Sequence, residues 1–364
     1  MNTTATITFY QTTSSNPSIY QNAPGAGQRR GYFVFAVTKN NADTYYITYL
    51  AAKADRFSGA IGKKGMTINM NSFIFIGGDM RSIYAAQRLG KRYTCCAYGF
   101  DLPEQTADVH ILREPTVCDC AVLPLPASLD GENINCPYRS ETLMPIGFDI
   151  LKKTVKKGGT IFTSKSFPLL EKICREEGFA LVNYFEREEL TVLNAVPTAE
   201  GALEIALREL PFTIHGSDVL ITGFGRIGRV LARDFSALGA RVSIASRKYS
   251  DIAWTRVYGC EPVSLIAPGE FEQKLKKADL IINTAPANIF DRKRLMLIRR
   301  DTVMIDLASK ISVEDLSLAE DVGVKVIWAR SLPGKTAPVT AGEIIADTLE
   351  NILAERSALH ESGR

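Results

Sequence analysis

Short apolar runs that alternate with helical stretches dominate the chain from residue 71 onward. Parallel strands buried on both faces have this appearance, because side chains on either face must be apolar. Strands that alternate with helices indicate parallel α/β sheets, and a long helical stretch between two sets of runs indicates two of them. The predicted strands are Phe73–Ile76, Thr94–Tyr98, Cys120–Pro126, Lys157–Thr163, Asp218–Thr222, Arg241–Ala245, Leu280–Asn283, Val303–Asp306 and Val324–Trp328.

Two helical segments are expected to connect the sheets. The first is Thr198–Leu210, with Thr198 as its N-cap and Pro211 as its stop. The second, near 340–355, places its apolar residues on one face, which is typical of packing against a body. The predicted fold is α/β, with two doubly wound Rossmann-like domains joined by hinge helices around a cleft. The expected divisions are 71–197, 198–339 and a C-terminal helix at 340–364 that packs back on the first domain.

Residues 1–70 do not follow this pattern. The β-rich runs 32–37 and 45–49 lie on either side of Asn40-Asn41, which predicts a hairpin, and the first 30 residues look loosely ordered. An isolated hairpin is marginally stable. Two interpretations remain open: a small β appendage, or an upstream segment outside the evolved protein, whose start would then be Met66 or Met70.

Composition excludes several classes of protein. With 43 Lys+Arg against 40 Asp+Glu, the net charge of +3 gives no field for nucleic acid or an anionic membrane. The chain has no apolar run of about 18 residues, so no membrane span is expected, and no secretory signal is visible. The seven cysteines are irregularly spaced with no histidine near enough for a zinc site, so we expect reduced thiols and no metal.

A dinucleotide fingerprint opens the second domain. Gly223-Phe224-Gly225-Arg226-Ile227-Gly228 follows a predicted strand and begins a helix. Gly223 would permit the tight turn, Gly225 the close approach of a pyrophosphate, and Gly228 the packing of helix on strand. The helix N-terminus would supply amide donors. The alternative is a glycine turn in a domain without nucleotide.

The next strand favours NADP over NAD as the cofactor. It ends in Ser246-Arg247-Lys248, where an NAD site usually carries an acidic residue for the ribose 2′-hydroxyl. A serine hydroxyl and an arginine suit a 2′-phosphate instead. The alternative is that the two cations are only solvated loop residues. Further cofactor contacts are expected at later strand ends, from Asn283, Thr284, Ala285, Pro286, Ala308 and Ser309.

The strand ends of the first domain and one loop of the second indicate a small anionic substrate. Arg81 would clamp a carboxylate with two parallel bonds, and Lys165 and Lys335 would add point charges. The alternative for Arg81 is an ion pair with Asp79. The remaining candidate substrate contacts are Gly78, Asp79, Ser164 and Ser166.

Six segments in unbroken order resemble the family of the dipicolinate synthase A subunit: 77–81, 98–100, 123–131, 194–202, the Gly223 fingerprint and 332–342. The resemblance covers residues 71 to 355 and departs from the family after Ser309, where Lys310-Ile-Ser-Val replaces a glycine-rich segment. It implies oxidation of a dihydrodipicolinate-type ring to pyridine-2,6-dicarboxylate with NADP or NAD. It further implies a partner, the B subunit of the synthase, and a place in the mother-cell cytoplasm during sporulation; a homo-oligomer is left open.

The acid–base group of this reaction is not fixed by the sequence. Lys165 is the candidate proton acceptor, with a water molecule as an equal alternative. Two other functions stay open: another two-domain NAD(P) dehydrogenase of the 2-hydroxy acid or amino acid type, and a cofactor-binding subunit without turnover of its own. The absence of histidine between residues 216 and 359 argues against a 2-hydroxy acid enzyme.

Overall fold

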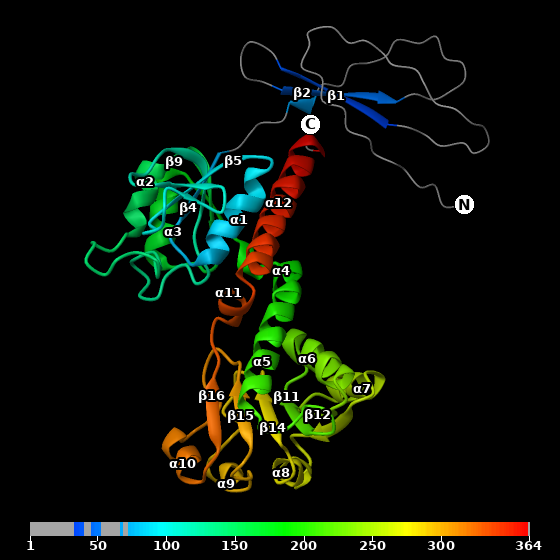
Figure 1. The fold of residues 1–364 in the computed structure, drawn as a ribbon. Coiled ribbons are helices and arrows are strands. Elements are labelled where there is room, and N and C mark those ends of the chain that lie inside the picture. The colour runs from blue at the N-terminus through cyan, green and yellow to red at the C-terminus, as the bar shows by residue number, and fades with distance from the viewer. Residues whose placement is uncertain (1–32, 40–44, 52–65, 68–71, 363–364) are drawn as a thin grey trace, which may run out of the picture. The chain divides into compact units, whose positions relative to one another are not determined.

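The computed structural model describes residues 33–39, 45–51, 66–67 and 72–362. It divides into two units, Met1–Met70 and Asn71–Arg364, each considered by itself (Figure 1). The first unit is a three-stranded antiparallel sheet in which β1 (Phe33–Lys39) pairs with β2 (Tyr45–Ala51) and β2 with β3 (Met66–Thr67). The two predicted hairpin strands are confirmed; the turn at Asn40-Asn41 and residues 1–30 lie outside the described residues.

The second unit begins with a seven-stranded sheet in the order β10-β9-β8-β4-β5-β7-β6. All neighbouring pairs are parallel except β6 with β7. The strands are β4 (Ser72–Ile76), β5 (Thr94–Tyr98), β6 (Gln105–Thr106), β7 (Val109–Leu112), β8 (Cys118–Val122), β9 (Val155–Thr163) and β10 (Ala180–Asn183).

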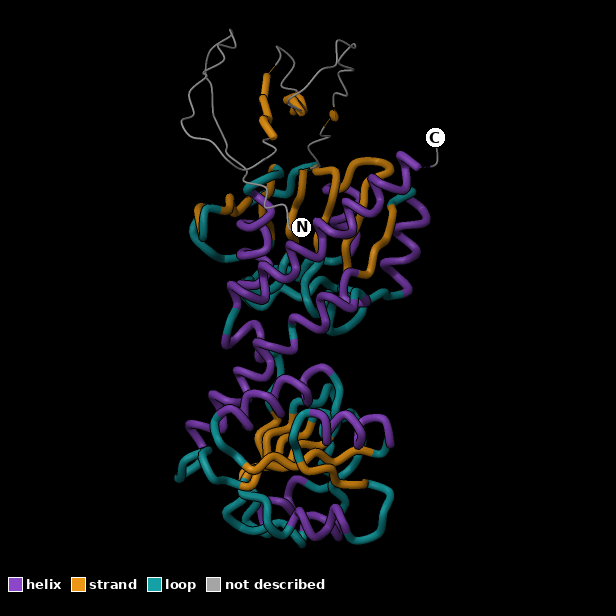
Figure 2. Tube along the Cα trace, turned by 90° about the vertical axis from the view of Figure 1, so that its right-hand side faces the viewer, coloured by secondary structure: helices purple, strands orange, loops and turns teal. Residues whose placement is uncertain are grey.

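A six-stranded, fully parallel sheet follows in the order β13-β12-β11-β14-β15-β16. This is the doubly wound order in which the first strand lies centrally and the chain reverses direction across the sheet. Its strands are β11 (Asp218–Thr222), β12 (Arg241–Ser246), β13 (Glu261–Ser264), β14 (Leu280–Asn283), β15 (Val303–Asp306) and β16 (Lys325–Trp328). The predicted α/β fold with two parallel sheets is therefore confirmed (Figure 2).

Helices cover both faces of both sheets. In the first sheet, α1 and the C-terminal helix α12 lie over one face, and α2 and α3 over the other. The helices of this part are α1 (Met80–Gly90), α2 (Leu151–Thr154), α3 (Pro168–Glu177), α4 (Glu188–Leu193) and α12 (Pro338–Ser362), with short 3-10 turns at Phe148–Ile150 and Tyr184–Glu186.

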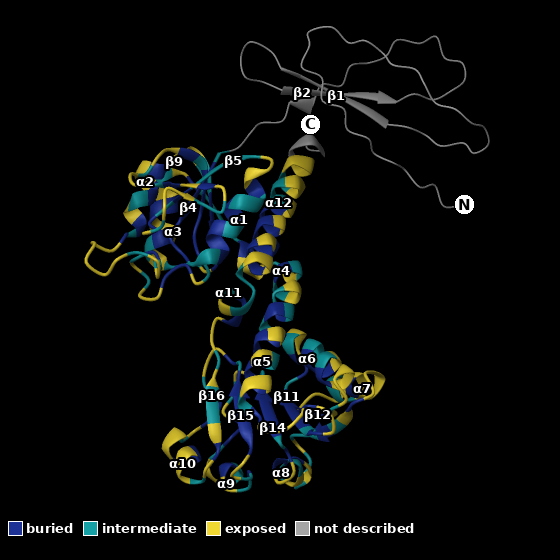
Figure 3. Cartoon of the chain, viewed as in Figure 1, coloured by how far each residue is buried: buried dark blue, intermediate teal, exposed yellow. Residues whose placement is uncertain are grey.

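In the second sheet, α5, α6 and α11 pack on one face, and α8, α9 and α10 on the other. The inner strands β11, β12, β14 and β15 are largely buried between these layers, whereas the outer surfaces of α7 to α10 are exposed (Figure 3). The helices are α5 (Ala195–Glu209), α6 (Arg226–Ala237), α7 (Tyr249–Val257), α8 (Glu270–Leu275), α9 (Arg292–Leu295), α10 (Leu316–Asp321) and α11 (Leu332–Thr336).

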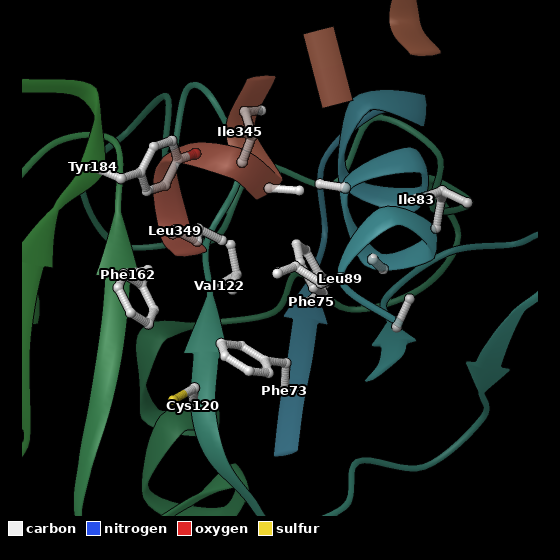
Figure 4. Close-up of a cluster of buried hydrophobic side chains, with 14 of the residues drawn as sticks. Phe73, Phe75, Ile83, Leu89, Cys120, Val122, Phe162, Tyr184, Ile345 and Leu349 are labelled. Carbon is white, nitrogen blue, oxygen red and sulfur yellow. The ribbon is translucent and has the colours of Figure 1, made fainter. Parts of the chain in front are cut away.

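The C-terminal helix is part of the first core. Ile345 and Leu349 of α12 are buried beside Ile83 and Leu89 of α1, over the strand residue Phe75 (Figure 4). The two helices approach closely at Gly342, where a Cβ would lie 2.7 Å from both the Arg81 carbonyl oxygen and the Tyr84 Cβ. The last helix therefore returns to the first sheet after the chain has built the second.

Two sequence-based boundaries are wrong. Helix α5 begins at Ala195, and the Thr198 hydroxyl donates to the Asn194 carbonyl at 2.8 Å inside the first turn, so Thr198 is not the cap. The reason is that α4 leads directly into α5, which leaves no extended residue to cap. Strand β8 ends at Val122, because the prolines at 124 and 126 lack the amide that would continue the ladder.

Candidate functional site: the carboxyl edges of the two sheets

The glycine turn after β11 forms an open backbone cradle. Gly223 has a φ of +92°, which favours glycine. A Cβ on Gly228 would lie 2.3 Å from the Gly223 carbonyl oxygen, so only glycine lets α6 approach the strand. A Cβ on Gly225, the N-cap of α6, would meet nothing within 4 Å. This open space before unpaired helix amides fits the pyrophosphate of a nicotinamide dinucleotide.

The side chains within the turn have different surroundings. Phe224 is buried in the core and lies edge-on to Tyr258, with ring centroids 5.2 Å apart, and Ile227 packs against the same core. Both therefore contribute to the cradle through their backbone. Arg226 instead donates from Nε to Glu188 Oε1 of α4 at 3.0 Å, in an exposed ion pair. Its Nε is therefore committed to Glu188.

Two cationic side chains lie at the end of β12, next to a serine whose hydroxyl is already hydrogen-bonded. Ser246 donates to Asp251 Oδ2 at 2.8 Å and accepts from the Lys248 amide at 3.2 Å, which closes the first turn of α7. A bond from Ser246 to a 2′-phosphate would require the bond to Asp251 to open. Arg247 and Lys248 are exposed, and neither side chain has an ionic or hydrogen-bonding partner in the described chain.

A buried polar network holds the loops after β14 and β15. Asn283 accepts from Thr222 Oγ1 at 2.5 Å and donates to Asp306 Oδ1 at 2.8 Å. Asp306 also accepts from the backbone and hydroxyl of Ser312, each at 2.7 Å, and from the Ala308 amide at 3.0 Å. Both Asn283 and Asp306 are fully buried. Asn283, predicted as a cofactor contact, is therefore buried within this network and positions the loops around it.

The remaining predicted cofactor residues lie at this same edge. Thr284 donates to the Thr222 carbonyl at 2.9 Å and lies over Gly223, while Ala285 follows beside it. Thr284 and Ala285 cover the turn, and Pro286 is exposed. Ala308 is buried and Ser309 exposed, and the Ala308 carbonyl accepts from Trp328 Nε1 at 3.0 Å.

In the first sheet, the structure places Arg81 in the alternative arrangement that the sequence left open. Asp79 caps α1 by accepting from the Arg81 amide, and the Arg81 guanidinium returns a two-point pair to the Asp79 carboxylate with a shortest contact of 2.8 Å. The Arg81 side chain also donates to the Leu125 carbonyl and is buried. A Cβ on Gly334 of α11 would lie 2.9 Å from Arg81 Nε, so backbone covers the pair.

The other first-sheet candidates differ in exposure. Ser164 is buried and donates to the Pro124 carbonyl at 2.7 Å, and Ser166 donates to Glu171 at 2.6 Å. Lys165 is exposed, with Nζ 5.4 Å from the Phe167 ring centroid. Lys335 is exposed on α11. Within the described residues, neither lysine forms an ion pair, so both remain available to an anion.

Tyr184 is a buried neighbour of this edge that the sequence analysis missed. Its hydroxyl donates to the Leu123 carbonyl at 3.0 Å, at the end of β8. Burial raises its pKa above the usual value, against the opposing effects of Arg81 and of a bond with Ser164. Tyr184 therefore stays a neutral donor that fixes the edge. In the sequence, this residue is marked only by the aromatic pair Tyr184-Phe185 that follows the short apolar run 180–182.

Two hollows on the described surface measure about 530 and 470 Å³. The first is lined by 129–132 and 167–169, including the Phe167 ring beside Lys165, and the second by residues from Tyr98 to Leu143. No predicted site residue forms part of either lining. In the described part of the chain, no cluster of three acidic, histidine or cysteine residues is arranged for a metal, and no helix has the length and hydropathy of a bilayer span. All seven cysteines are free thiols.

Comparisons with known proteins agree with this arrangement. Residues 72–185 match the family model of the dipicolinate synthase A subunit's N-terminal domain, and 199–355 match "D-isomer specific 2-hydroxyacid dehydrogenase, NAD binding domain". The chain is 35% identical over 289 residues to the dipicolinate synthase A subunit of Bacillus subtilis (strain 168), covering 78% of this chain and 96% of that protein. The chain belongs to the family of dipicolinate synthase A subunits.

Solved structures of this family share the fold. The dipicolinate synthase A subunit from Bacillus halodurans is 31% identical with a TM-score of 0.69, over 78% of this chain and 98% of that one. Its counterpart from Bacillus subtilis is 31% identical with a TM-score of 0.68, over 80% and 98%. The second sheet of this family member is thus a dehydrogenase-type domain for a nicotinamide cofactor, and the predicted resemblance is confirmed.

Proposed function

We propose that this chain is the nicotinamide-binding subunit of a dipicolinate synthase, which oxidises a dihydrodipicolinate-type ring to pyridine-2,6-dicarboxylate with NADP⁺. The observation that carries the proposal is the intact cradle of Gly223, Gly225 and Gly228 in a chain of this family. We further propose that its partner is the B subunit of the synthase, because the relatives are named as one subunit of such an enzyme. The setting would be the mother-cell cytoplasm of a sporulating cell.

The choice of NADP rests on the charges at the end of β12. A 2′-phosphate adds negative charge where Arg247 and Lys248 stand exposed without acidic partners in the described chain. The strand-end position itself carries no carboxylate to bind a free 2′-hydroxyl. The Asp251 carboxylate accepts a bond from Ser246, which directs it into the first turn of α7.

The proposed substrate contacts rest on two lysines that form no ion pair within the described residues. Exposed Lys165 and Lys335 would attract the two ring carboxylates, while Arg81, held by Asp79, would shape the strand ends with Gly78, Ser164 and Ser166. When bound, the nicotinamide accepts a hydride from a ring carbon. A proton must also leave the ring. A water molecule beside Lys165 would receive it, or Lys165 itself where its amine is not paired with a carboxylate. Because the product ring is aromatic, orientation and charge neutralisation would supply most of the rate.

A coupled assay tests the proposal. The ring precursor made by dihydrodipicolinate synthase is supplied with NADP⁺ to the full chain, with and without the B subunit. The expected result is a rise in absorbance at about 340 nm, the nicotinamide band that follows from hydride transfer, together with pyridine-2,6-dicarboxylate. Cofactor binding without product in either mixture would favour a subunit that has no turnover. Product only with a 2-hydroxy acid or an amino acid would favour another dehydrogenase.

A further inference from the structure

A substrate with two carboxylates needs charged donors that are free to bind it. Arg81 was expected to clamp one carboxylate. Its guanidinium instead donates to Asp79 and to the Leu125 carbonyl, and the backbone of Gly334 covers this pair. Freeing Arg81 would leave the partly buried Asp79 carboxylate without its partner and would remove the ion pair of a buried guanidinium, which is costly. Bidentate recognition of a carboxylate is a property of arginine rather than lysine. The exposed lysines at these edges therefore do not replace what Arg81 was expected to supply.

Arg330 lies at the carboxyl edge of the second sheet. The Ala329 amide donates to the Asp306 carbonyl at 2.8 Å, which is the bond that ends the pairing of β16 with β15. Arg330 is the next residue, at the carboxyl edge beside the loop that carries Ala308 and Ser309. Ser331 then takes a left-handed φ of +58° and turns the chain into α11 with Lys335.

The Arg330 side chain is held in place, but its N–H donors have no hydrogen-bonding partner in the described chain. Its guanidinium carbon lies 4.8 Å from the Trp328 ring centroid, and Trp328 is itself fixed by the bond from Nε1 to the Ala308 carbonyl. A guanidinium that stacks on a ring keeps its N–H edge for a planar anion. Arg330 is exposed, and it forms no hydrogen bond or ion pair with another residue that the structure describes.

We propose that Arg330 binds one carboxylate of the heterocyclic substrate from the cofactor side, with Trp328 as its platform. This inference rests on the proposed function, since it specifies how the substrate of that reaction is recognised. Arg330 would touch the substrate and set its orientation relative to the Ala308–Ser309 loop, so it is a binding and specificity residue. The alternative is that Arg330 only shields the indole of Trp328 from water.

Binding of two pyridine acids separates these interpretations. Pyridine-2,6-dicarboxylate and pyridine-2-carboxylate are titrated by calorimetry, in metal-free buffer, into the full chain with its B-subunit partner and NADPH. The chains compared are wild type, Arg330→Gln, Arg330→Lys and the control Arg256→Gln, which removes an exposed arginine without an ionic partner in the described chain from the end of α7. KM for the ring precursor is measured on the same proteins.

The expected result is a loss of discrimination. Arg330→Gln should weaken the dicarboxylate about tenfold or more, as for a charged hydrogen-bonded contact. It should weaken the monocarboxylate far less, because that ligand can still use the other carboxylate site. KM should rise with NADPH affinity unchanged, Arg330→Lys should recover part of the loss, and Arg256→Gln should match wild type.

Three results would overturn the inference. If Arg330→Gln binds both acids like wild type and turns over normally, the residue only covers Trp328, while the proposed function stands. If NADPH affinity falls together with dicarboxylate affinity, Arg330 is a cofactor contact. If wild type neither binds the dicarboxylate nor forms product in the coupled assay, the proposed function fails, and this inference fails with it.

Discussion

Replacing Gly225 by alanine should separate cofactor binding from folding. The backbone of Gly225 has a φ of −78°, which an L-residue adopts without strain, and a Cβ there meets nothing within 4 Å. The methyl group would stand in the space left for the pyrophosphate. Loss of the glycine N-cap costs up to about 1 kcal/mol of stability. Alanine also lowers the conformational entropy of the unfolded chain, which offsets about 0.4–1 kcal/mol of that loss. Stability should therefore change by less than about 1 kcal/mol.

The effect on the ligand should be much larger. Forcing a methyl group into a close contact costs about 1–3 kcal/mol, which corresponds to about 5- to 150-fold in Kd for NADPH. Calorimetric titration measures Kd, and thermal unfolding measures stability. Gly228→Ala is the matched control, because its Cβ would lie 2.3 Å from the Gly223 carbonyl oxygen. That variant should lose about 3 kcal/mol and unfold about 6–12 °C lower.

Two results would refute this reasoning. If Gly225→Ala binds NADPH as wild type does, the pyrophosphate does not approach the backbone at this turn, and the cradle is only a tight connection between β11 and α6. If Gly225→Ala fails to fold, the open space before α6 is filled in solution by another part of the molecule. Either result would remove the observation on which the proposed function rests.

Three other predictions concern the cofactor, acid stability and the last helix. Replacing Arg247 and Lys248 together by alanine should raise Kd for NADPH about tenfold or more and leave NADH nearly unchanged in titrations; equal losses for both would contradict a 2′-phosphate contact. Burial raises the pKa of Asp119, but bonds from Lys156 and Ser72 outweigh it and hold the net pKa below its usual value. The stabilisation is therefore present above the pKa of Asp119 in the unfolded chain and is lost as the pH falls. Asp119→Asn should lower the free energy of unfolding in urea by about 1 kcal/mol at pH 7, and the difference from wild type should shrink below about pH 4. A difference that stays constant with pH would contradict this. Gly342→Ala should cost about 1–3 kcal/mol in thermal unfolding, whereas exposed Glu343→Ala should not.

The strands that the sequence predicted are those whose pattern is local. A buried parallel strand is a continuous apolar run, so β4, β11 and β14 are visible without any knowledge of their neighbours. Some strands at or next to a sheet edge escaped notice because their composition is mixed. β7 (Val109–Leu112), next to the edge strand β6, contains an exposed histidine, and the edge strand β13 (Glu261–Ser264) contains a proline, which an edge tolerates.

In the candidate site, too, features set by a few neighbouring residues were predictable from the sequence, and features set by distant parts of the chain were not. The cradle was predictable because three glycines within six residues determine it, whatever surrounds them. The state of Arg81 was not, since it depends on Gly334, whose backbone arrives from far along the chain to cover the pair with Asp79. Arg330 carries no motif at all. Its exposed position next to Ala308 follows from the pairing of β16 with β15, so only the folded chain shows that this arginine lies exposed at the carboxyl edge while Arg81 is buried.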